Sequence, residues 1–508
     1  MSPSFKTIDL FAGPGGLAEG FSSLRDGSGR RLFDIALSVE KEPSAFATLR
    51  MRAFTRQFEQ LPDSYHDYVS GRISRDELIS RHPEEWGEAV RETAMLELGS
   101  DSARQWLDPV LARIRQDAGD NTVVIGGPPC QAYSLVGRAR NRGIAGYDAA
   151  TDHRHFLYRE YIRILEQLRP VAFVMENVKG MLSAKVGGVG MIDQILSDLR
   201  AAGGEPDSYL LIPLVDDARG GMPGILIRSE DFGIPQCRHR VILVGIRKDI
   251  FERRGLGSRE LPTLRPAPAR ATVKNVLEGM PSLRSGLSRT ADTPEAWRDA
   301  AIVAFRKAAS ACNSDGPWLA EVSRKLAAYA KGLREQDNLP PRSSTAPAPI
   351  LDNRLSAWLV DPRLPMLPNH ESRGHMPGDL ARYAFAAAFA EVFDRSPKAD
   401  EFPKDLAPDH RNWESGKFAD RFRVQTWKAP STTVTSHISK DGHYFIHPDP
   451  AQCRSLTVRE AARLQTFPDN YFFEGNRTQQ YVQVGNAVPP LLARQIAELL
   501  AELLDPGR

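Results

Sequence analysis

The sequence predicts an α/β protein built on a doubly wound, mostly parallel sheet, together with a second and smaller domain. Two observations carry this prediction. Short apolar segments rich in β-branched residues alternate with amphipathic helical segments over residues 1–250, which is the pattern of parallel strands joined by helices. The chain also has 508 residues, more than a single hydrophobic core usually supports.

The expected strands lie in the first half of the chain, with helices between them. Apolar residues recur at three- and four-residue spacing in FLYREYIRILEQLR (156–169) and MIDQILSDLRAAGG (191–204), which predicts helices there. Such alternation places successive strands parallel to one another. The expected strands are FKTIDLFAG (5–13), IALSVE (35–40), TVVIGG (122–127), VAFVMENV (171–178), YLLIPLV (209–215) and HRVILVGI (239–246).

Changes of pattern divide the chain into domains. Residues 50–120 are charged and helical, and we expect them to form an insertion within a cofactor-binding domain at 1–250. Proline and arginine accumulate over 251–430, which predicts a separate lobe with long loops. Residues 431–508 return to the first domain. There we expect a hairpin around Asp441-Gly442 and helices over TVREAARLQTF (457–467) and PPLLARQIAELLAELL (489–504).

Composition and charge exclude several classes of protein. Residues 251–430 hold 28 Lys and Arg against 22 Asp and Glu, a surplus of 6 that fits a polyanionic partner or an ordinary solvated surface. The four cysteines are widely separated and form no CxxC pair, which argues against structural zinc and a disulfide framework. No apolar run is long enough to span a membrane and MSPSFKTIDLF has no signal-peptide core, so we expect a cytoplasmic protein.

The segment DLFAGPGGLAEGF (9–21) follows the first strand and opens a helix. Gly13 and Gly15 remove Cβ atoms where backbone would approach a ligand closely. Glu40 ends the second strand, where a carboxylate can accept hydrogen bonds from ribose hydroxyls. Because Gly13-x-Gly15-x-x-Ala18 also satisfies a loose dinucleotide fingerprint, this loop alone fits a nicotinamide cofactor, S-adenosyl-L-methionine, or a tight turn with no ligand.

The strand in VVIGGPPCQAYS (123–134) ends in a thiol. Pro128 and Pro129 fix φ and remove two donors, so the loop is stiff before any ligand arrives. Ligands of open α/β sheets bind at this edge, so we interpret Cys130 as a functional thiol, the alternative being a buried inert cysteine. The glycine- and arginine-rich LVGRARNRGIAGYD (135–148) suits a loop that closes over a phosphate backbone, or a plain solvated loop.

Polar side chains mark two further strand ends. Glu176 and Asn177 end an apolar strand on the same edge as Cys130. A carboxylate leaving a buried strand is costly unless it is paired or protonated, and the alternative interpretation is a satisfied structural carboxylate. Gln236, Arg238 and Arg240 alternate as QCRHR enters the last strand, which predicts one shared face, or else an exposed basic edge strand.

Taken in order, these motifs resemble those of the DNA (cytosine-5)-methyltransferases of bacterial restriction–modification systems. The ordered set is far more specific than any single motif. The resemblance implies a Rossmann-like fold that uses S-adenosyl-L-methionine, yields S-adenosyl-L-homocysteine, needs no metal and acts on double-stranded DNA. The motifs are DLFAGPGG, PPCQAYS, MENVKG, QCRHR, RSLTVREAARLQTFPDNY and QVGNAVPP, over residues 5–250 and 430–505.

The resemblance also implies a role for each candidate residue. Cys130 would add to C6 of cytosine, Glu176 would be a protonated acid toward N3, and Arg240 would contact O2 with Arg238 nearby. The target base must flip out of the duplex to reach them. Expected cofactor contacts are Phe11, Gly13, Gly15, Glu40, Asp101, Asn486 and Val488, and expected substrate contacts are Pro129, Gln131, Ser134, Asn177 and Gln236.

Residues 251–430 occupy the place of the family's target-recognition domain. The resemblance further implies a cognate restriction endonuclease as a partner, a monomer on DNA and a nucleoid-associated location. The chain departs from compact relatives in its long segment before Cys130 and in Pro128, where several relatives carry an aromatic residue. His437, His443, His447 and Cys453 match no common metal-site spacing.

Three other functions compete with this one. They are an RNA cytosine-5 methyltransferase acting on transfer RNA, a non-catalytic DNA-binding relative, and a dehydrogenase. The large lobe at 251–430 favours DNA over RNA, and intact Cys130, Glu176 and Arg240 favour catalysis. A dehydrogenase would leave Cys130 and Glu176 without a role.

Overall fold

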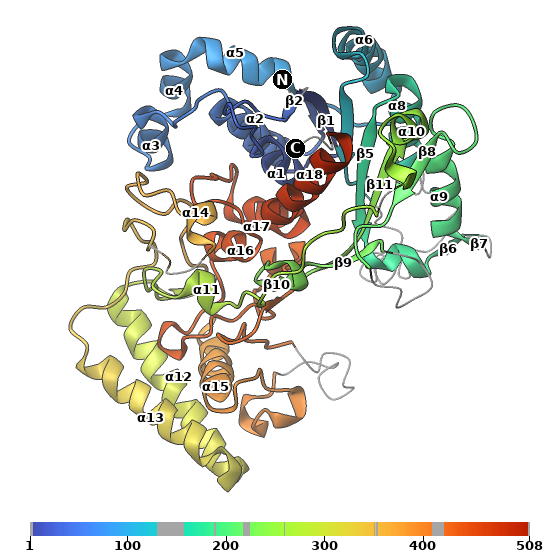
Figure 1. Ribbon diagram of the computed structural model, residues 1–508. Coiled ribbons are helices and arrows are strands. Elements are labelled where there is room, and N and C mark those ends of the chain that lie inside the picture. The colour runs from blue at the N-terminus through green and yellow to red at the C-terminus, as the bar shows by residue number, and fades with distance from the viewer. Residues whose placement is uncertain are drawn as a thin grey trace.

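The computed structural model places an α/β lobe above a smaller, mainly helical lobe (Figure 1). It describes residues 4–129, 157–186, 189–216, 224–258, 260–349, 351, 354–408 and 421–505.

An eight-stranded sheet forms the centre of the α/β lobe. Its strands are β1 (Phe5–Leu10), β2 (Phe33–Glu40), β3 (Thr93–Met95), β4 (Thr122–Gly126), β5 (Ala172–Val178), β8 (Tyr209–Ile212), β9 (Leu226–Arg228) and β11 (His239–Arg247). They run in the order β3-β2-β1-β4-β5-β11-β8, and β9 also pairs with β11. Strands β1 to β5 pair in parallel, whereas β11 is antiparallel to β5, β8 and β9. The predicted mostly parallel sheet is confirmed.

Helices cover both faces of the sheet, because the strands are apolar on both sides. Phe5 of β1 packs into one core with α1 (Gly16–Ser22) and α18 (Pro490–Leu504). Ile8 and Leu10 of the same strand face the other core. That second core holds α6 (Asp101–Ala118), α8 (Leu157–Leu168) and α9 (Met191–Arg200). The helices predicted over 156–169, 191–204 and 489–504 are therefore confirmed.

Four short helices in the segment between β2 and β4 pack against the C-terminal part of the chain. They are α2 (Pro43–Thr55), α3 (Asp63–Val69), α4 (Arg75–Arg81) and α5 (Pro83–Glu92). They share an apolar core with Leu364, and the hydroxyl of Tyr65 donates to the carbonyl of Asn470 at 2.8 Å. Sequence analysis missed β3, a three-residue edge strand inside this segment.

The lower lobe has an apolar core of its own. It is built by α12 (Pro294–Asp315), α13 (Ala320–Glu335) and α15 (Pro377–Phe393), with Trp297 fully buried at its centre. A further core joins the lobes. Residues from 271–280 and 351–367 pack there with α16 (Val458–Leu464) and α17 (Arg477–Asn486).

The predicted hairpin around Asp441-Gly442 is wrong. Gly442 does turn the chain (φ 77°), but the flanking residues bond to other segments. The amide of Arg423 donates to the carbonyl of His443, and the amide of Ile446 donates to the carbonyl of Arg423. The amide of Leu456 donates to the carbonyl of Phe445. Residues 431–432 form β14 (Ser431–Thr432), which pairs in parallel with β10 (Gln236–Cys237).

The remaining short elements connect these layers. They are β6 (Lys185–Val186), β7 (Val189–Gly190), α10 (Lys248–Arg253), α11 (Lys274–Leu277), β12 (Gly286–Leu287), α14 (Ser356–Leu359) and β13 (Gly374–His375).

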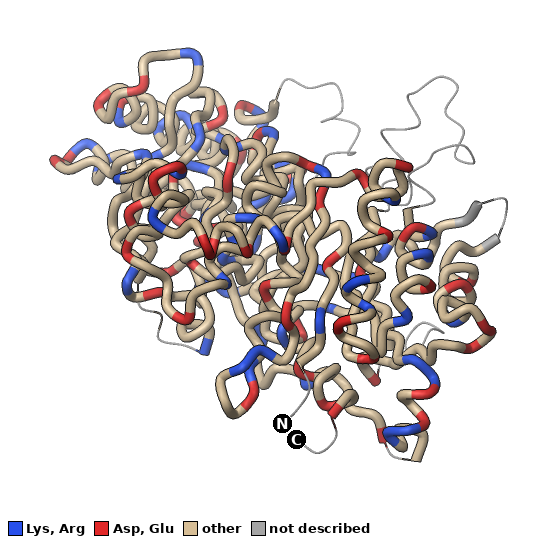
Figure 2. The backbone as a smooth tube through the Cα atoms, turned by 90° about the horizontal axis from the view of Figure 1, so that it is seen from above, with Lys and Arg blue, Asp and Glu red and all other residues tan. Residues whose placement is uncertain are grey.

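Charge is dispersed over the molecule. Figure 2 shows Lys and Arg interspersed with Asp and Glu along the described chain. Among the described residues, the distribution of charge therefore does not mark a nucleic-acid face, and the site has to be argued from individual side chains. In the described parts of the chain, no helix combines the length and hydropathy needed to cross a membrane.

Candidate active site

The turn after β1 is held in a left-handed conformation. Phe11, Gly13 and Gly15 have φ of 55°, 57° and 98°. A Cβ on Gly15 would lie 2.9 Å from Cδ1 of Leu49, whereas a Cβ on Gly13 would meet no described atom within 4 Å. The φ of 98° at Gly15 favours glycine, because other residues rarely adopt it, while the backbone at Gly13 borders open space where a ligand can approach.

Glu40 fastens this turn from the neighbouring strand. Its Oε2 accepts the amide of Gly13 at 2.8 Å, and its Oε1 accepts the amide of Glu42 at 2.7 Å. Each carboxylate oxygen can accept a second hydrogen bond, so Glu40 has capacity left for the hydroxyls of a ribose. The predicted residues Phe11, Gly13 and Gly15 therefore lie in one turn. Glu40, at the end of β2, is hydrogen-bonded to that turn.

The QVGNAVPP segment lies against the same turn. A Cβ on Gly16 would come within 2.3 Å of the carbonyl oxygen of Val488, so backbone meets backbone there. The hydroxyl of Tyr471 donates to the carbonyl of Pro14 from the other side. Asn486, two residues before Val488 in the sequence, is exposed. Val488 thus adjoins the start of α1, and Tyr471 is a support that sequence analysis did not identify.

Asp9 is a second residue that sequence analysis missed. Its side chain is fully buried on β1, and neither carboxyl oxygen has a hydrogen-bond partner among the described residues. Burial raises the pKa of Asp9 to about 8, and the charge of Arg56 opposes part of that rise. The signal was available, since Asp9 is an ionisable residue inside the apolar run of FKTIDLF.

Glu176 and Arg240 meet at the edge where β5 ends and β11 begins. Nε of Arg240 lies 2.8 Å from Oε1 of Glu176, and the two side chains are only 14% and 12% exposed. The antiparallel pairing of β11 with β5 brings the first residues of one strand to the last residues of the other. Burial lowers the pKa of Arg240, and the charge of Glu176 offsets part of that effect.

The proline corner adjoins this ion pair. A Cβ on Gly127 would lie 3.0 Å from Oε2 of Glu176, so this glycine lets the carboxylate approach the backbone. Nδ2 of the buried Asn177 donates to the carbonyl of Pro128 at 3.1 Å and holds the corner in place. Pro129 completes the described part of this corner. The predicted residues Cys130, Gln131 and Ser134 lie outside the described residues.

Arg238 and Gln236 make contacts different from those of Arg240. Arg238 is 1% exposed and donates to the carbonyls of Val434 and Gly485 at 2.9 and 3.1 Å, with a longer bond of 3.4 Å to Asn486. Burial lowers the pKa of Arg238 well below its usual range, and the nearby charge of Arg240 adds to the effect.

The amide of Gln236 is likewise engaged inside the protein. Its Nε2 donates to the carbonyl of Leu464 and to Oε1 of Gln465, and its Oε1 accepts the amide of Val434 at 2.7 Å. Both side chains therefore fasten β10 and the start of β11 to the C-terminal segments.

Asp101 stands apart from these clusters. It is the first residue of α6, its side chain is fully exposed, and its nearest cationic group is Arg104 at 3.9 Å. The carboxylate that the structure brings near the end of β2 is Glu97, which pairs with Lys41 at 3.0 Å.

The scattered histidines of the C-terminal region bind protein groups. His443 bonds with the hydroxyl of Tyr383 at 2.8 Å, and the thiol of Cys453 donates to the carbonyl of Leu380 at 3.1 Å. Within the described ranges, no three His, Cys, Asp or Glu side chains form a group that could hold a metal ion.

Comparison with known proteins adds three findings. Residues 112–502 match the model of the C-5 cytosine-specific DNA methylase family. The chain is 33% identical to the type II methyltransferase M.Bpa9945I of Bacillus paralicheniformis, over 98% of this chain and 99% of that protein. It is 28% identical to the type II methyltransferase M.AgeI of Thalassovita gelatinovora, over 97% and 99% of the two chains.

A solved structure supports the fold. The crystal structure of a prophage-encoded E. coli protein, assigned as a DNA modification methyltransferase, superposes with a TM-score of 0.53. The superposition covers 99% of this chain and all of that one at 19% sequence identity.

Proposed function

Because the chain belongs to the C-5 cytosine-specific DNA methylase family and is a DNA (cytosine-5-)-methyltransferase, we propose that it methylates C5 of a cytosine flipped out of duplex DNA through a covalent adduct with Cys130. The methyl donor in this proposal is S-adenosyl-L-methionine. The observation that carries the proposal is the buried Glu176–Arg240 pair, which abuts Gly127 at the edge of the sheet. A base stacked in a duplex cannot reach groups buried in this way, so the target must leave the helix.

The residues divide the reaction between them. The thiolate of Cys130 adds to C6 of cytosine, and the new S–C6 bond makes C5 nucleophilic. Glu176 holds N3 and the N4 amino group, and Arg240 turns from Glu176 to the O2 carbonyl when the base enters. After C5 has taken the methyl group, a water molecule accepts the C5 proton and the S–C6 bond breaks to restore the thiolate.

The turn after β1 is the proposed cofactor site. When bound, S-adenosyl-L-methionine supplies an electrophilic methyl group. Open space at Gly13 and spare acceptor capacity on Glu40 fit a ligand with a ribose. Phe11, Asn486 and Val488 border the same turn in this proposal, and Asp101 is assigned to it by sequence position only.

Gln236 and Arg238 are positioning residues in this proposal. Their contacts with the C-terminal segments fix the backbone four and two residues before Arg240, so they act on the base through Arg240. Asn177 acts in the same way on the proline corner that precedes Cys130, while Pro129, Gln131 and Ser134 are proposed to contact the flipped nucleotide.

We assign target recognition to the lobe within residues 251–430, where side chains would read base edges in the major groove. The type II names of the relatives support a cognate restriction endonuclease as a partner. We propose that the enzyme acts as a monomer, in the cytoplasm and on the nucleoid.

Bisulfite sequencing of plasmid DNA from expressing cells tests the reaction. We expect cytosines protected within one recurring sequence, and protection should disappear in Cys130→Ala. Unprotected cytosines with folded, cofactor-binding protein would refute methylation of DNA. Transfer of label from the methyl donor to transfer RNA but not to duplex DNA would show that the substrate is RNA rather than DNA.

Covalent capture tests the thiol separately. Duplex DNA with 5-fluorocytosine at the target position blocks loss of the C5 substituent, so a competent thiolate stays attached to C6. We expect a denaturation-resistant protein–DNA complex for the native chain and none for Cys130→Ala, which should still bind DNA and cofactor. Capture by the alanine variant would assign the nucleophile to another residue.

A further inference from the structure

The helices α2 and α17 support the proposed cofactor turn at two points. The amide of Glu42, which caps α2, donates to Oε1 of Glu40 at 2.7 Å, and Oε2 of Glu40 accepts the amide of Gly13. Two residues beyond the end of α17, Val488 lies against Gly16. The separation of α2 from α17 therefore helps to set the distance between Glu40 and Val488 across the turn.

The side chain of Gln483 joins these two helices. It lies on α17, is 2% exposed, and both polar atoms of its amide are hydrogen-bonded. Its Oε1 accepts the hydroxyl of Thr48 on α2 at 2.7 Å. Its Nε2 donates to the hydroxyl oxygen of Ser44 on α2 at 3.3 Å and to the carbonyl of Glu474 at 2.9 Å. Because a carbonyl oxygen can only accept, the contact with Glu474 fixes which end of the amide faces α2 at each point.

The hydrogen bonds of Gln483 continue to the start of α2. The hydroxyl of Ser44, which accepts from Gln483, donates in turn to Oε2 of Glu42 at 2.6 Å. The same carboxylate caps the first turn of α2, and the amide of Glu42 is bonded to Glu40. The series of hydrogen bonds that begins at Gln483 therefore ends at Glu40, the proposed ribose acceptor.

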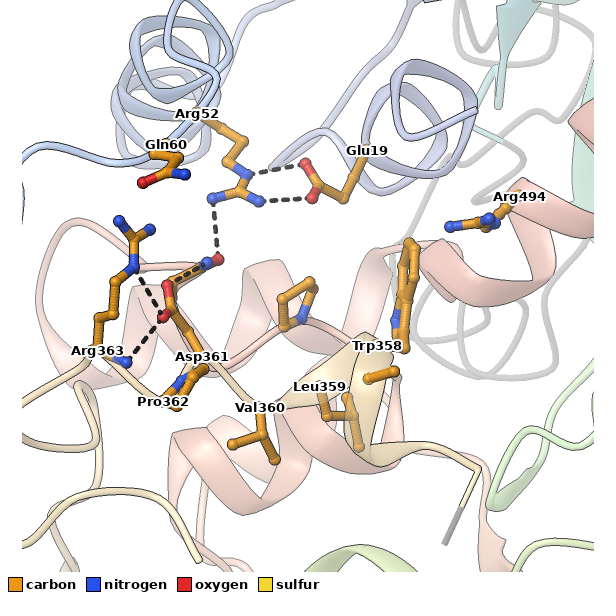
Figure 3. Close-up of a pocket in the computed structure, with 13 residues that line it drawn as sticks. Glu19, Arg52, Gln60, Trp358, Leu359, Val360, Asp361, Pro362, Arg363 and Arg494 are labelled. Atoms are coloured by element: carbon orange, nitrogen blue, oxygen red, sulfur yellow. Dashed lines mark hydrogen bonds and ion pairs between the residues drawn. The ribbon is translucent and has the colours of Figure 1, made fainter. Parts of the chain in front are cut away.

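The last turn of α2 is held by different groups. Figure 3 shows Arg52 pointing from α2 to Glu19 of α1, and two hydrogen bonds of 2.8 and 2.6 Å join them. Arg52 also donates to Oδ1 of Asn470 at 3.1 Å. This ion pair fixes the end of α2 that is remote from Glu42, whereas Gln483 fixes the end that is close to it.

We propose that Gln483 is a positioning residue for the methyl donor, an inference that rests on the proposed function of the turn. Gln483 does not touch the donor in this proposal. It holds Glu40 and Val488 at the separation that the donor requires, and it does so before the donor binds. A site already held in its binding geometry loses less conformational entropy when the ligand arrives, so its affinity is higher.

Calorimetric titration of the full-length protein with S-adenosyl-L-homocysteine, in the absence of DNA, tests the proposal. Gln483→Leu removes the three hydrogen bonds of the amide and keeps a side chain of similar size. We expect the dissociation constant to rise by about tenfold, because buried partners lose their hydrogen bonds and the first turns of α2 are released. The KM for S-adenosyl-L-methionine should rise by a similar factor, with kcat at saturating donor close to that of the native chain.

Substitutions at Thr48 test the same contact from α2. Thr48→Val keeps the shape of the side chain but removes the hydroxyl that donates to Gln483, so affinity for S-adenosyl-L-homocysteine should fall. Thr48→Ser keeps the hydroxyl and loses a methyl group, so it should retain most of the affinity. If Gln483→Leu does not fold, this pair of variants provides the test.

Gln480→Leu is the matched control. Gln480 lies on the same helix, and its Nε2 donates to the carbonyls of Phe473 and Gly475 rather than to α2, so this variant should bind S-adenosyl-L-homocysteine like the native chain. Native affinity in both Gln483→Leu and Thr48→Val, an equal loss in Gln480→Leu, or a fall in kcat with unchanged KM would overturn the positioning role. A native chain that does not bind S-adenosyl-L-homocysteine would instead refute the proposed cofactor site, and this inference with it.

Discussion

The segment around α16 and the sheet edge at Asp9 and Glu176 both bury charge, but they use it in opposite ways. In the α16 segment, Arg454 meets Glu460 through bonds of 2.7 and 2.6 Å, and Arg463 meets Asp469 through bonds of 2.8 and 2.6 Å. None of these four side chains has a buried nitrogen or oxygen without a partner in the described structure.

The sheet edge is incompletely satisfied by comparison. Neither oxygen of Asp9 has a hydrogen-bond partner among the described residues, and Glu176 pairs with Nε of Arg240 through Oε1, with its Oε2 close to Gly127. Burying an unsatisfied polar group costs stability, so we expect such a group where function requires it. The two regions thus differ in pairing: the α16 segment satisfies each of its buried charges, whereas the buried carboxyl of Asp9 is left without a partner among the described residues.

Removing the acid at the sheet edge should have the largest effect. Glu176→Gln keeps the shape and the hydrogen bonds toward the base but cannot give a proton, so kcat should fall by about 10²–10⁴ with DNA binding retained. Single-turnover methylation measures this. Glu230→Gln is the matched control, because Glu230 is a buried carboxylate bonded to His239 near the same strand and should change the rate little. An unchanged rate in Glu176→Gln would show that Glu176 is not the acid and that the catalytic site lies elsewhere.

The α16 segment should respond in stability instead. Arg463→Met leaves Asp469 buried without its guanidinium partner, which should cost about 3–5 kcal/mol of unfolding free energy. The shift in denaturant midpoint measures it. The double variant Arg463→Met/Asp469→Leu should lose much less, because no uncompensated charge remains. Equal losses in the single and double variants would contradict the pairing argument.

Asp9 provides a test that depends on pH. Its folded-state pKa of about 8 lies above the value of 3.8 for an unperturbed aspartate, so its contribution to stability is present below about pH 4 and is lost as the pH rises toward 8. Asp9→Asn should therefore be more stable than the native chain at pH 8, by up to about 5 kcal/mol, and nearly equal at pH 4. Denaturation at both pH values measures the difference, and a gap independent of pH would contradict it.

The smallest effect is expected at Asp101. A fully exposed carboxylate contributes little to binding, so Asp101→Ala should change the dissociation constant for S-adenosyl-L-homocysteine by about two- to threefold at most. Titration calorimetry measures this, with Glu40→Gln as the variant that should weaken binding more. A loss larger than that of Glu40→Gln would place Asp101 in direct contact with the cofactor.

The parts of the fold that follow from local pattern were predictable. Strand ends at Glu40 and Glu176 and the glycine turn at Gly13 are marked by apolar runs that stop at polar residues. Arg238 and Arg240 are the same residue type in adjacent positions of one alternating pattern. Which of them contacts backbone carbonyls and which pairs with Glu176 depends on the segments that pack beside them, and the local pattern does not contain that information. The hairpin failed for the same reason, since residues 443–446 pair with segments distant from the turn.

The core that joins the two lobes has a consequence for engineering new sequence specificity. Residues 271–280 and 351–367 lie within the middle of the chain, but they pack with α16 and α17. Exchange of the proposed target-recognition segment at residues 251 and 430 would therefore remove part of the core that packs against α16 and α17. Chimeras should instead keep these two stretches and transplant the interval that holds α12 and α13 and the interval that holds α15.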